Sequence, residues 1–414
     1  MSVNYKGTVL ILSTYPIVEP KHGGQLRVQN IKRAYERAGW KVINTAVYTE
    51  EAYSSNEVGS TDVAFPADSA YRLFNGRFVY FVNDLTAGRF AAAEDGGLPL
   101  ILSKLPSKVD VIQVEQSWLW PLALKLRSHP IGQGALLVNS SHNIETPLKK
   151  GIFEGAGIDN ARDALDAIEE LEMRAARDAD ITLSVTREEG ETLSKWGARN
   201  VLLLPNGIEP WSADQELLDK WRRKLPRYNW LLYVASAHPP NFSHFAEIFG
   251  GSLGCFPPTT KLVVVGGVCE HIYAALSATK WSSLNHSRLE LLFSLPEQDL
   301  SAVKTLAHGF VLPIPFGGGS NIKTAEALYS GAYVVGTPSA FRGYEEFTSL
   351  PEVRIGRNPS EFQKGIREVL SLPRPSLSAS QSDYAALRSG LCWDKCLEKL
   401  PIEVEKMLSK KGAS

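Results

Sequence analysis

The sequence predicts an α/β protein built from two doubly wound parallel-sheet domains, and three observations support this prediction. Short apolar runs alternate with helix-length segments over most of the chain, as in repeated strand–helix–strand units. With 414 residues, the chain is longer than one hydrophobic core usually supports. A polar stretch near residue 210 separates two series of apolar runs. We therefore expect one domain over residues 1–208, a second over 209–378, and C-terminal helices over 379–414.

The composition is that of an ordinary globular protein. It is 44% hydrophobic and 21% charged, and 44 basic and 45 acidic residues give a net charge of −1. This balance argues against general nucleic-acid binding, which needs an excess of positive charge. The first apolar run, Thr8–Leu12, is too short for a signal peptide, and no run approaches the ~20 apolar residues of a membrane span. We therefore expect a cytoplasmic protein.

Neither the cysteines nor the acidic clusters predict a metal site. The four cysteines, Cys255, Cys269, Cys392 and Cys396, do not form the pattern of a disulfide framework in so long a chain. No His or Cys pair lies near the last two to complete a zinc site. Asp178-Ala179-Asp180 has the spacing of a DxD metal motif, but its place between a helix and a strand favours a simple helix end. We expect free thiols and no metal.

The first half of the chain opens with a clear strand–helix–strand unit. Thr8–Leu12 predicts a buried strand and Lys41–Tyr48 the next one. Between them, Gly23-Gly24 opens an amphipathic helix that ends at Gly39. Tyr53–Gly97 is poorly periodic and predicts only loops with one or two helices. The later predicted elements are a helix over 159–180 and strands over 109–115, 135–140, 181–185 and 201–204.

Two polar side chains stand at the carboxyl ends of these predicted strands. Glu115 ends one strand, and His142 follows the next. Ligands of open α/β sheets bind outside the carboxyl ends of the strands, so both residues stand where chemistry can occur. A lone histidine at a strand end is also often structural, and both interpretations stay open at this point.

The first predicted helix carries an excess of positive charge. Against Glu36 alone stand four basic residues, Arg27, Lys32, Arg33 and Arg37. Such a face is suited to anionic lipid or to a phosphorylated acceptor. The favoured alternative is a solvated helix face.

The second half repeats the alternation of strands and helices. Trp211–Tyr228 is polar and charged and predicts a connector between the domains. Five short apolar runs then predict a second parallel sheet, over 230–235, 260–266, 288–293, 309–314 and 333–336. Pro373–Ser382, rich in Pro and Ser, interrupts this pattern before a last helical stretch over 393–408.

A glycine-rich stretch after the fourth of these runs predicts a phosphate-binding turn. Three glycines, Gly317, Gly318 and Gly319, lack the Cβ atoms that would keep a ligand from the backbone. Ser320 or Asn321 is placed to cap the helix that follows. The free N–H groups at such a helix start favour anions, especially phosphate.

Lys323 and Glu326 follow in the first two turns of this helix. Lys323 would supply a mobile positive charge to a diphosphate, and the Glu326 carboxylate would accept two hydrogen bonds from a ribose diol. The combination suggests a nucleoside diphosphate. Packing alone is the alternative for a glycine-rich turn, and neither the Walker spacing nor Gly-x-Gly-x-x-Gly after a strand is present.

Taken in order along the chain, several motifs resemble those of family-4 retaining glycosyltransferases. They are Gly-Gly-x-x-Arg-Val-x-x-Ile from Gly23, Ser-Ser-His-Asn-Ile-Glu from Ser140, Leu-Pro-Asn-Gly-Ile from Leu204, Val-Val-Val-Gly-Gly from Val263, and Gly-Gly-Gly-Ser-Asn-Ile-Lys-Thr-Ala-Glu-Ala-Leu from Gly317. The resemblance covers nearly the whole chain. It implies the GT-B fold, in which two Rossmann-like domains face a central cleft and a C-terminal helix crosses back to the first domain.

The resemblance also implies an activity. A glycosyltransferase of this family moves a sugar, with retention, from a nucleoside diphosphate sugar such as a UDP-, GDP- or dTDP-sugar, and requires no metal or other cofactor. The acceptor is a glycan or a lipid-linked glycan of a bacterial surface polysaccharide or glycoconjugate. The basic face over residues 27–41 adds the expectation of peripheral contact with the inner face of the plasma membrane.

Site residues carry over by their places in these motifs. The resemblance makes Glu326 the ribose ligand, His142 the histidine that faces the donor sugar, and Lys323 the partner of the diphosphate, and we expect these three to be catalytic. The rest of the donor site would consist of Gly23, Gly24, Gly318, Gly319, Ser320 and Asn321. On the acceptor side we expect Glu115 and Arg27.

Two positions depart from the family pattern. Gly318 stands eight positions before Glu326, where members often carry a first glutamate that touches the sugar. Many members also have an arginine near the first strand of the second domain. Here Ala235–Asn241 occupies that region, so His238 or Asn241 would take over the contact with phosphate.

Two rival functions remain open, one from the same fold and one suggested by the missing first glutamate. A sugar-nucleotide epimerase uses similar halves, with carboxylates such as Glu115 acting as acid and base on the sugar. A non-catalytic scaffold or nucleotide-sugar sensor would explain the missing first glutamate. An epimerase needs no acceptor, and a scaffold would tolerate the loss of Lys323 or Glu326.

Overall fold

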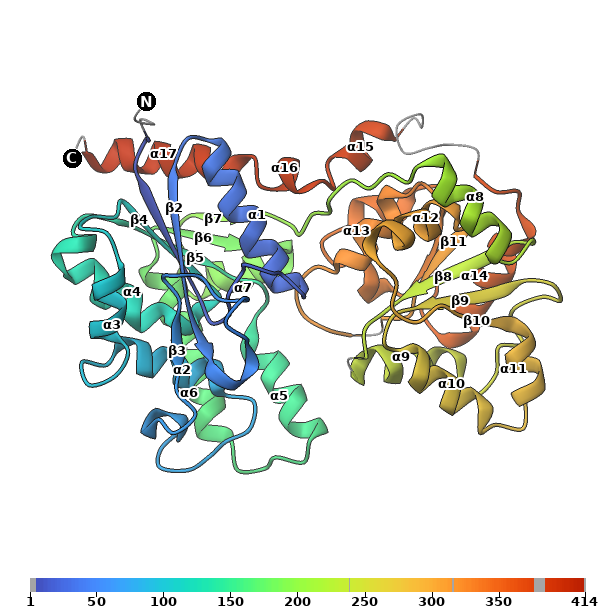
Figure 1. The fold of residues 1–414 in the computed structure, drawn as a ribbon, viewed down its shortest axis with the longest axis horizontal. Helices are drawn as coiled ribbons and strands as arrows, with labels where there is room; N and C mark the ends of the chain where they lie inside the picture. The colour runs from blue at the N-terminus through green and yellow to red at the C-terminus, as the bar shows by residue number, and fades with distance from the viewer. Residues whose placement is uncertain (1–4, 238, 315, 376–383, 413–414) are drawn as a thin grey trace. The chain divides into compact units, whose positions relative to one another are not determined.

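The computed structural model describes residues 5–237, 239–314, 316–375 and 384–412. Contacts divide the chain into two compact units, one of Met1–Asn206 with Cys396–Ser414 and the other of Gly207–Lys395. Each unit contains a parallel sheet with helices on both faces (Figure 1). Within the described residues, no helix is both long enough and apolar enough to cross a membrane.

The first unit is built on a sheet in which the described residues form seven parallel strands in the order β3-β2-β1-β4-β5-β6-β7. The strands are β1 Thr8–Ser13, β2 Lys41–Thr49, β3 Val63–Phe65, β4 Val111–Glu115, β5 Leu136–Ser140, β6 Ile181–Ser184 and β7 Val201–Leu203. The helices of this unit are α1 Gly23–Arg37, α2 Asn83–Ala92, α3 Leu98–Lys104, α4 Trp120–Ser128, α5 Glu145–Gly155, α6 Arg162–Asp178, α7 Arg187–Lys195 and α17 Lys399–Gly412. The order changes direction between β1 and β4, and in open α/β sheets the crevice that binds ligands lies at the carboxyl ends of the strands at such a switch point.

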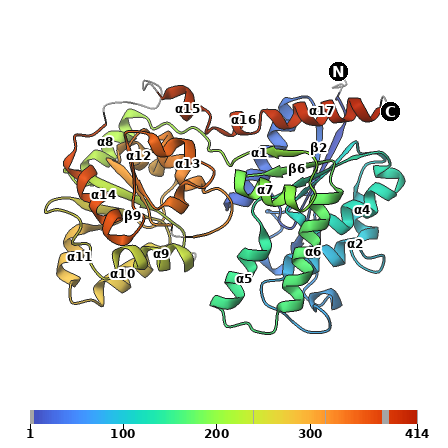
Figure 2. The ribbon, with the colours of Figure 1, turned by 180° about the vertical axis from the view of Figure 1, so that it is seen from behind.

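The two faces of this sheet are covered by different helices. Helices α2, α4 and α6 pack over one face, as the view from behind shows (Figure 2). There Leu10 and Leu12 of β1 are fully buried with Leu122 of α4. Helix α1 packs against β2 and α17, and α17 also contacts β5. Burial of the strands on both sides explains why they read as continuous apolar runs in the sequence.

The second unit repeats this plan with six strands among the described residues, in the order β10-β9-β8-β11-β12-β13, again all parallel. The strands are β8 Trp230–Val234, β9 Lys261–Val265, β10 Leu289–Leu291, β11 Gly309–Leu312, β12 Tyr333–Gly336 and β13 Val353–Ile355. The helices are α8 Gln215–Lys224, α9 Pro239–Phe249, α10 Cys269–Ser277, α11 Ser282–Arg288, α12 Glu297–Leu306, α13 Ile322–Tyr329, α14 Pro359–Ser371, α15 Ala385–Ser389 and α16 Trp393–Cys396, the last of which continues into the first unit. The switch point of this sheet lies between β8 and β11.

The sheet of the second unit also has two separate cores. Alternate residues of β8 show this, since Leu232 packs with α8, α12 and α13 while Leu231 packs with α9, α10 and α14. Both leucines are fully buried. The predicted α/β class with two parallel sheets is therefore confirmed.

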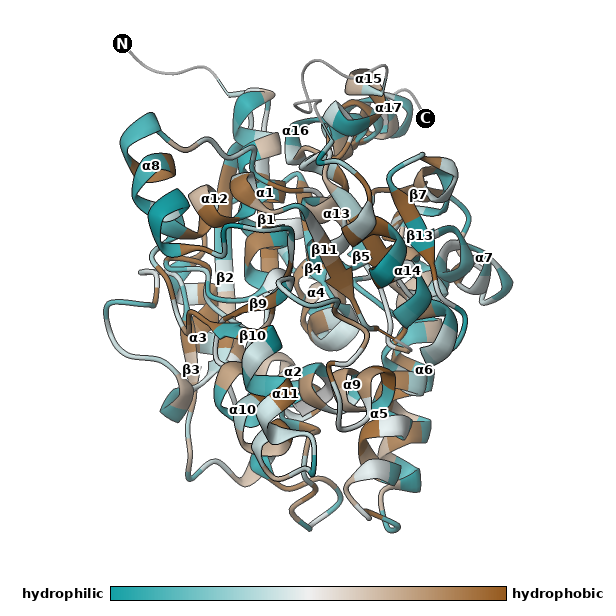
Figure 3. Ribbon diagram, turned by 90° about the vertical axis from the view of Figure 1, so that its right-hand side faces the viewer, coloured by the Kyte–Doolittle hydropathy of each residue, from teal (hydrophilic) through white to brown (hydrophobic). Residues whose placement is uncertain are grey.

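The segment expected to be a connector, Trp211–Tyr228, lies within the second unit and contains a packed helix. It contains α8, whose start is capped by the Asp214 carboxylate, which accepts a hydrogen bond from the Leu217 N–H at 2.8 Å. Trp221 on α8 is only 5% exposed and packs in the core. The ribbon in Figure 3 shows both hydrophilic and hydrophobic residues along α8. The prediction was wrong because the high charge of the segment concealed a helical apolar stripe at Leu217, Leu218 and Trp221.

Other elements were not predicted from the sequence. Tyr53–Gly97 contains the short strand β3, and Val353–Ile355 forms β13 at the edge of the second sheet. Helix α5 follows His142 directly and was also missed. Each strand has three residues, which is too short for a periodic pattern to be recognised.

The C-terminal segment is divided between the two units. Arg388 on α15 is 1% exposed, and its guanidinium donates to the Glu352 carboxylate at 2.7 Å and to the Leu328 carbonyl, which ties α15 to the second unit. Helix α17 belongs to the first unit, where Lys411 donates to the Ala135 carbonyl at 3.1 Å. The predicted helix that returns to the first domain is therefore α17. Of the predicted break over 373–382, residues 376–382 lie outside the described part.

Candidate functional site

At the switch point of the first sheet, Glu115 and His142 form a buried pair. Glu115 ends β4, and its side chain is fully buried. Its Oε2 lies 2.7 Å from His142 Nε2, and its Oε1 accepts a hydrogen bond from Gln113 at 2.5 Å. On the other side of the imidazole, Nδ1 lies 3.3 Å from the Tyr15 hydroxyl. Both residues lie at the strand ends, as the sequence indicated, but their direct contact was not predicted, and Glu115 is fully buried and not on the surface.

The carboxylate sets the orientation and tautomer of His142. Burial lowers the pKa of His142, although the Glu115 carboxylate opposes this shift. In the neutral ring, Nε2–H donates to Glu115, and the Nδ1 lone pair faces the Tyr15 hydroxyl, which donates to it. His142 is 9% exposed, so only a small part of the residue is accessible.

The start of α1 approaches the same pair. His22 caps α1 by accepting a hydrogen bond from the Gln25 N–H, and its ring packs edge-on against Tyr15 with centroids 5.0 Å apart. A Cβ at Gly24 would lie 2.8 Å from the Tyr15 hydroxyl, so any larger residue would require the Tyr15 side chain to shift. Gly23 begins the helix. Tyr15 thus lies between the predicted Gly23-Gly24 turn and His142 and contacts both Gly24 and the histidine.

Arg27 differs from its prediction as part of an exposed basic face. It is 1% exposed, and its Nη1 donates to the Leu204 carbonyl at 3.0 Å and to the Asn206 side chain at 3.1 Å. Arg27 therefore joins α1 to the segment that leaves the first unit. The exposed residues Arg33 and Arg37 stay on the helix face, while Lys32 is half-buried and pairs with Glu36.

A second buried carboxylate, Glu145, lies next to this crevice at the start of α5. Its Oε1 accepts hydrogen bonds from Gln116 at 2.7 Å and from Asn143 at 2.9 Å. Gln116 directly follows Glu115 and has a φ of 59°, a strained conformation that is common at functional sites. Glu172 of α6 accepts hydrogen bonds from the first N–H groups of α5. Burial, with a contribution from nearby carboxylates, raises the pKa of Glu145 to about 7.

In the second unit, the glycine-rich turn follows β11 at the switch point. Gly317 has a φ of 143° and Gly319 a φ of 64°, backbone conformations that favour glycine. The Asn321 side chain caps α13 by accepting a hydrogen bond from the Lys323 N–H at 3.1 Å. Of the two predicted caps, Asn321 is therefore the one used. Arg342 donates to the carbonyls of Gly318 and Gly319, at 3.3 and 3.2 Å, and so fixes the turn.

Lys323 lies in the first turn of α13 and is held from the neighbouring loop. Its Nζ donates to Asn241 Oδ1 at 2.7 Å, which connects the segments after β8 and β11. Burial lowers the pKa of Lys323 to about 8, while the Glu326 carboxylate partly opposes this shift. Of the two residues proposed to replace the family arginine, Asn241 is close to Lys323, and His238 lies outside the described residues.

Glu326 forms an ion pair with Lys304, a residue that the sequence analysis did not identify. Lys304 of α12 lies 3.0 Å from the Glu326 carboxylate, and its ammonium stands 4.2 Å from the centre of the Trp211 ring. The Lys304 side chain is 8% exposed and that of Glu326 is 27% exposed. The carboxylate is therefore neutralised on its buried side and accessible on the other.

The expected helix end at Asp178 and the expected free cysteines concern residues away from these sites. No group of three metal-ligating side chains occurs among the described residues. Asp178 ends α6, as expected, and pairs with Arg174 and Arg177. The four cysteines are free.

Tyr15, Lys304 and Arg342 are among the contributors to these sites that were missed in the sequence. Each lies far along the chain from the residue that it contacts, and nothing in the local pattern marks it. Only the position of Tyr15 just after β1 carried a signal, since loops at the carboxyl ends of strands line the crevice.

No protein-family model and no curated protein matches the chain, but solved structures do. Sucrose-phosphate synthase from Thermosynechococcus elongatus is 13% identical with a TM-score of 0.68, covering 98% of this chain and 100% of that chain. HepE from Anabaena in complex with UDP is 12% identical with a TM-score of 0.65, covering 96% of this chain and 100% of that chain. An α,α-trehalose-phosphate synthase (UDP-forming) from Burkholderia vietnamiensis is 13% identical with a TM-score of 0.65, again covering 96% and 100%. The fold is therefore GT-B, with two Rossmann-like domains, as predicted.

The raised pKa of Glu145 predicts a pH-dependent stability. The folded state favours the protonated carboxyl, so this contribution to stability is complete below the ordinary pKa of 4.5 and is lost as pH rises through about 7. Glu145→Gln keeps the Oε1 acceptor and removes the titration. We expect the variant to match the wild type at pH 5 and to exceed its free energy of unfolding at pH 8 by on the order of 1–3 kcal/mol.

Chemical unfolding at pH 5, 6, 7 and 8 measures this difference. Glu154→Gln is the matched control, because Glu154 lies on the same helix but is exposed. The control should follow the wild type at every pH. A Glu145→Gln variant whose stability runs parallel to that of the wild type over this range would contradict the assignment.

Proposed function

We propose that this chain is a glycosyltransferase that moves a sugar from a nucleoside diphosphate sugar to a glycan or lipid-linked acceptor, with retention of configuration. The observation that carries the proposal is the start of α13, where a glycine-rich turn leads into a helix that carries Lys323 and Glu326 in its first two turns. Glycosyltransferase names and a bound UDP among structures of the same fold agree with it. The expected setting is bacterial surface-polysaccharide or glycoconjugate synthesis in the cytoplasm, with peripheral contact at the membrane.

The second unit would bind the donor nucleotide. Glu326 is paired with Lys304 on its buried side, so its exposed oxygen is able to accept hydrogen bonds from the ribose hydroxyls. Lys323 would stabilise the diphosphate as negative charge develops on the leaving group. The N–H groups at the start of α13 add a second source of positive potential, with Gly318, Gly319 and Ser320 as the backbone that approaches the phosphates.

The first unit would present His142 to the donor sugar. Its neutral imidazole is fixed by Glu115, so the exposed edge of the ring is held in a constant position. In this proposal Glu115 is a positioning residue for His142 and does not touch the acceptor. No side chain is assigned as nucleophile, and the leaving phosphate would act as base for the incoming hydroxyl.

The same geometry bears on the two rivals. An epimerase needs a carboxyl group free to exchange protons with the sugar, but Glu115 is fully buried and engaged by His142 and Gln113. The scaffold is favoured by a single observation, the absence of a glutamate at Gly318. Nucleotide binding alone would be sufficient for a scaffold, so turnover distinguishes it from a transferase.

Binding of one nucleoside diphosphate is the first expected outcome. In a thermal-shift panel of UDP, GDP, dTDP, ADP and CDP, one ligand should raise the melting temperature by several degrees, since ligand at 100 times its Kd stabilises by about 2.7 kcal/mol. Glu326→Ala removes the ribose contact and should reduce that shift. Glu290→Ala is the control, because Glu290 forms an accessible pair with Lys261 elsewhere in the same unit. The absence of a shift with all five ligands would refute the proposed donor site.

The affinity for that diphosphate should depend on pH through Lys323. Its pKa of about 8 makes the free side chain charged at pH 7 and mostly neutral at pH 9.5, while a bound diphosphate favours the charged form. We expect the association constant to be nearly flat from pH 7 to 8 and then to fall, approaching tenfold per pH unit. Isothermal titration between pH 7 and 9.5 measures this slope.

Lys323→Arg is the matched control for this titration, because arginine stays charged over the whole range. Ionisation of the ligand affects both proteins equally and cancels in the comparison. Equal slopes for the wild type and the arginine variant would assign the pH dependence to another group.

Turnover tests the enzymatic part of the proposal. With the nucleoside diphosphate glucose of the selected base, the wild type should slowly transfer glucose to water and so release the nucleoside diphosphate. NMR of the glucose first formed should show retained anomeric configuration. Loss of an electrostatic contact to the transition state costs about 10²–10³-fold, so Lys323→Ala should lose activity on this scale. His142→Ala should also lose turnover while keeping diphosphate affinity. Tight binding without any release would favour the scaffold.

A further inference from the structure

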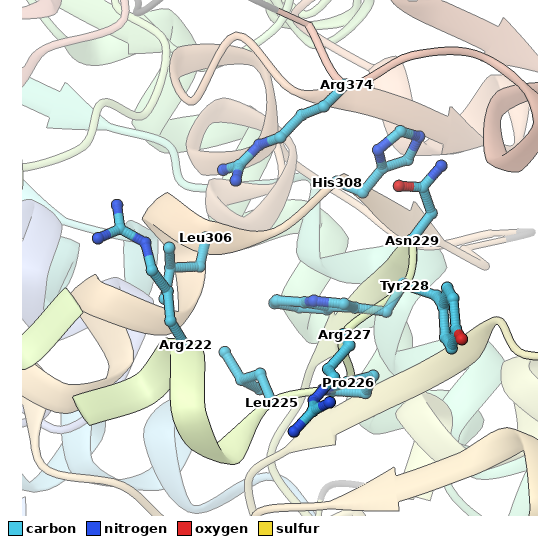
Figure 4. Close-up of a pocket in the computed structure, with 10 residues that line it drawn as sticks. Arg222, Leu225, Pro226, Arg227, Tyr228, Asn229, Leu306, His308 and Arg374 are labelled. Carbon is cyan, nitrogen blue, oxygen red and sulfur yellow. The ribbon is translucent and has the colours of Figure 1, made fainter. Parts of the chain in front are cut away.

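A pocket in the second unit lies away from the proposed donor site. It has a volume of about 410 Å³ and is lined by residues from the end of α8, the start of β8, the end of α12 and the segment after α14 (Figure 4). Ligand pockets commonly occupy 300–1,000 Å³, so a small metabolite would fit. The lining residues are Arg222, Leu225, Pro226, Arg227, Tyr228, Asn229, Trp230, Leu306, His308 and Arg374.

This pocket and the glycine-rich turn lie at opposite ends of the same strand. His308 immediately precedes β11, and the turn with Gly317 follows its carboxyl end. Four residues of strand separate the two ends by about 13 Å. A ligand in the pocket would therefore occupy a site distinct from the one proposed for the diphosphate.

Positive charge dominates the lining. Three arginines contribute to the pocket, and burial together with the charge of Arg222 lowers the pKa of Arg374. Arg374 donates to the Thr305 carbonyl at 2.6 Å, and no carboxylate in the described part of the chain forms an ion pair with it. Arg222 pairs with Asp219 on its own helix at 2.7 Å, in an exposed contact. Among the described residues, the guanidinium of Arg374 thus has no anionic partner, and phosphate is a group that such arginines bind well.

His308 supplies a second, independent indication of a ligand. It is 2% exposed, and its Nε2 lies 2.8 Å from the Val369 carbonyl. Because a carbonyl only accepts, Nε2 carries the proton, and Nδ1 of the neutral ring is an acceptor. This buried Nδ1 has no hydrogen-bond partner among the described residues. Buried acceptors of this kind are costly unless a donor reaches them, and a hydroxyl group is such a donor.

We propose that this pocket binds a phosphorylated polyol of the size of a hexose phosphate, with the phosphate at Arg374 and Arg222 and a hydroxyl group at His308 Nδ1. Leu225, Leu306 and the aromatic Trp230 give the pocket apolar walls, against which the C–H face of a sugar ring packs. The site does not depend on the donor site and would work equally in a transferase or a scaffold.

Isothermal titration of the full chain with glucose 6-phosphate, inorganic phosphate and glucose tests the proposal. Glucose 6-phosphate should bind most tightly, inorganic phosphate about tenfold more weakly, and glucose not measurably. Arg374→Gln should weaken both phosphate ligands by at least about tenfold. His308→Gln keeps a donor for the Val369 carbonyl but has no acceptor at the Nδ1 position, so it should weaken glucose 6-phosphate and leave inorganic phosphate unchanged.

Two controls separate this site from others. Lys323→Ala alters the proposed diphosphate site and should leave glucose 6-phosphate binding intact. Arg354→Gln removes an arginine that pairs with Glu368 in an accessible contact on the same unit, and it should also have no effect. Melting temperatures of all variants identify loss of folding.

Four results would overturn the inference. One is no binding of glucose 6-phosphate at millimolar concentration, and another is normal binding in Arg374→Gln. The third is loss of binding in Lys323→Ala, which would place the ligand at the diphosphate site. The fourth is equal affinity for inorganic phosphate and glucose 6-phosphate, which would leave no role for the hydroxyl contact.

Discussion

Parallel pairing of β8 with β11 is the constraint on which the proposed donor site depends. Parallel neighbours end at the same edge of a sheet, and at the switch point the chain leaves them in opposite directions. The segment after β8 therefore meets the segment after β11, which brings Asn241 within 2.7 Å of Lys323. Asn241 and Lys323, 82 positions apart, thus become part of one site because of strand order. The hydrogen bond that holds the lysine needs a residue from each of the two segments.

The charges around α13 help the buried Lys323 to stay protonated. Burial by itself lowers the pKa of Lys323, and Glu326 on the same helix partly restores it. A bare carboxylate at that place would also repel a diphosphate. Lys304 removes this conflict, because it neutralises Glu326 from the buried side while the Trp211 ring supports the ammonium. The carboxylate is then able to bind hydroxyls without a net negative charge toward the phosphates.

The sequence predicted the fold class well because the main strands are buried on both faces and read as apolar runs. β12 coincides with its prediction, and β1, β8 and β11 differ by one or two residues. The short edge strands β3 and β13 and the charged helix α8 carried too little local signal. For the candidate sites, the glycine turn and strand ends gave Lys323, Glu326, Glu115 and His142. Contacts such as Lys304 with Glu326 depend on the distance between separate elements in space, which local patterns do not encode.

Gly318 is the position where the sequence departs most from the pattern that it resembles, and the structure gives this departure a physical context. The carbonyls of Gly318 and Gly319 accept hydrogen bonds from Arg342, and a Cβ at Gly317 would lie 3.1 Å from the same guanidinium. The arginine therefore fills the space beside the turn and fixes its backbone. In a turn held this way, donor sugar hydroxyls would be met by fixed backbone groups in place of a flexible glutamate. Such contacts lose less conformational entropy on binding, which makes the absence of a glutamate compatible with an active site.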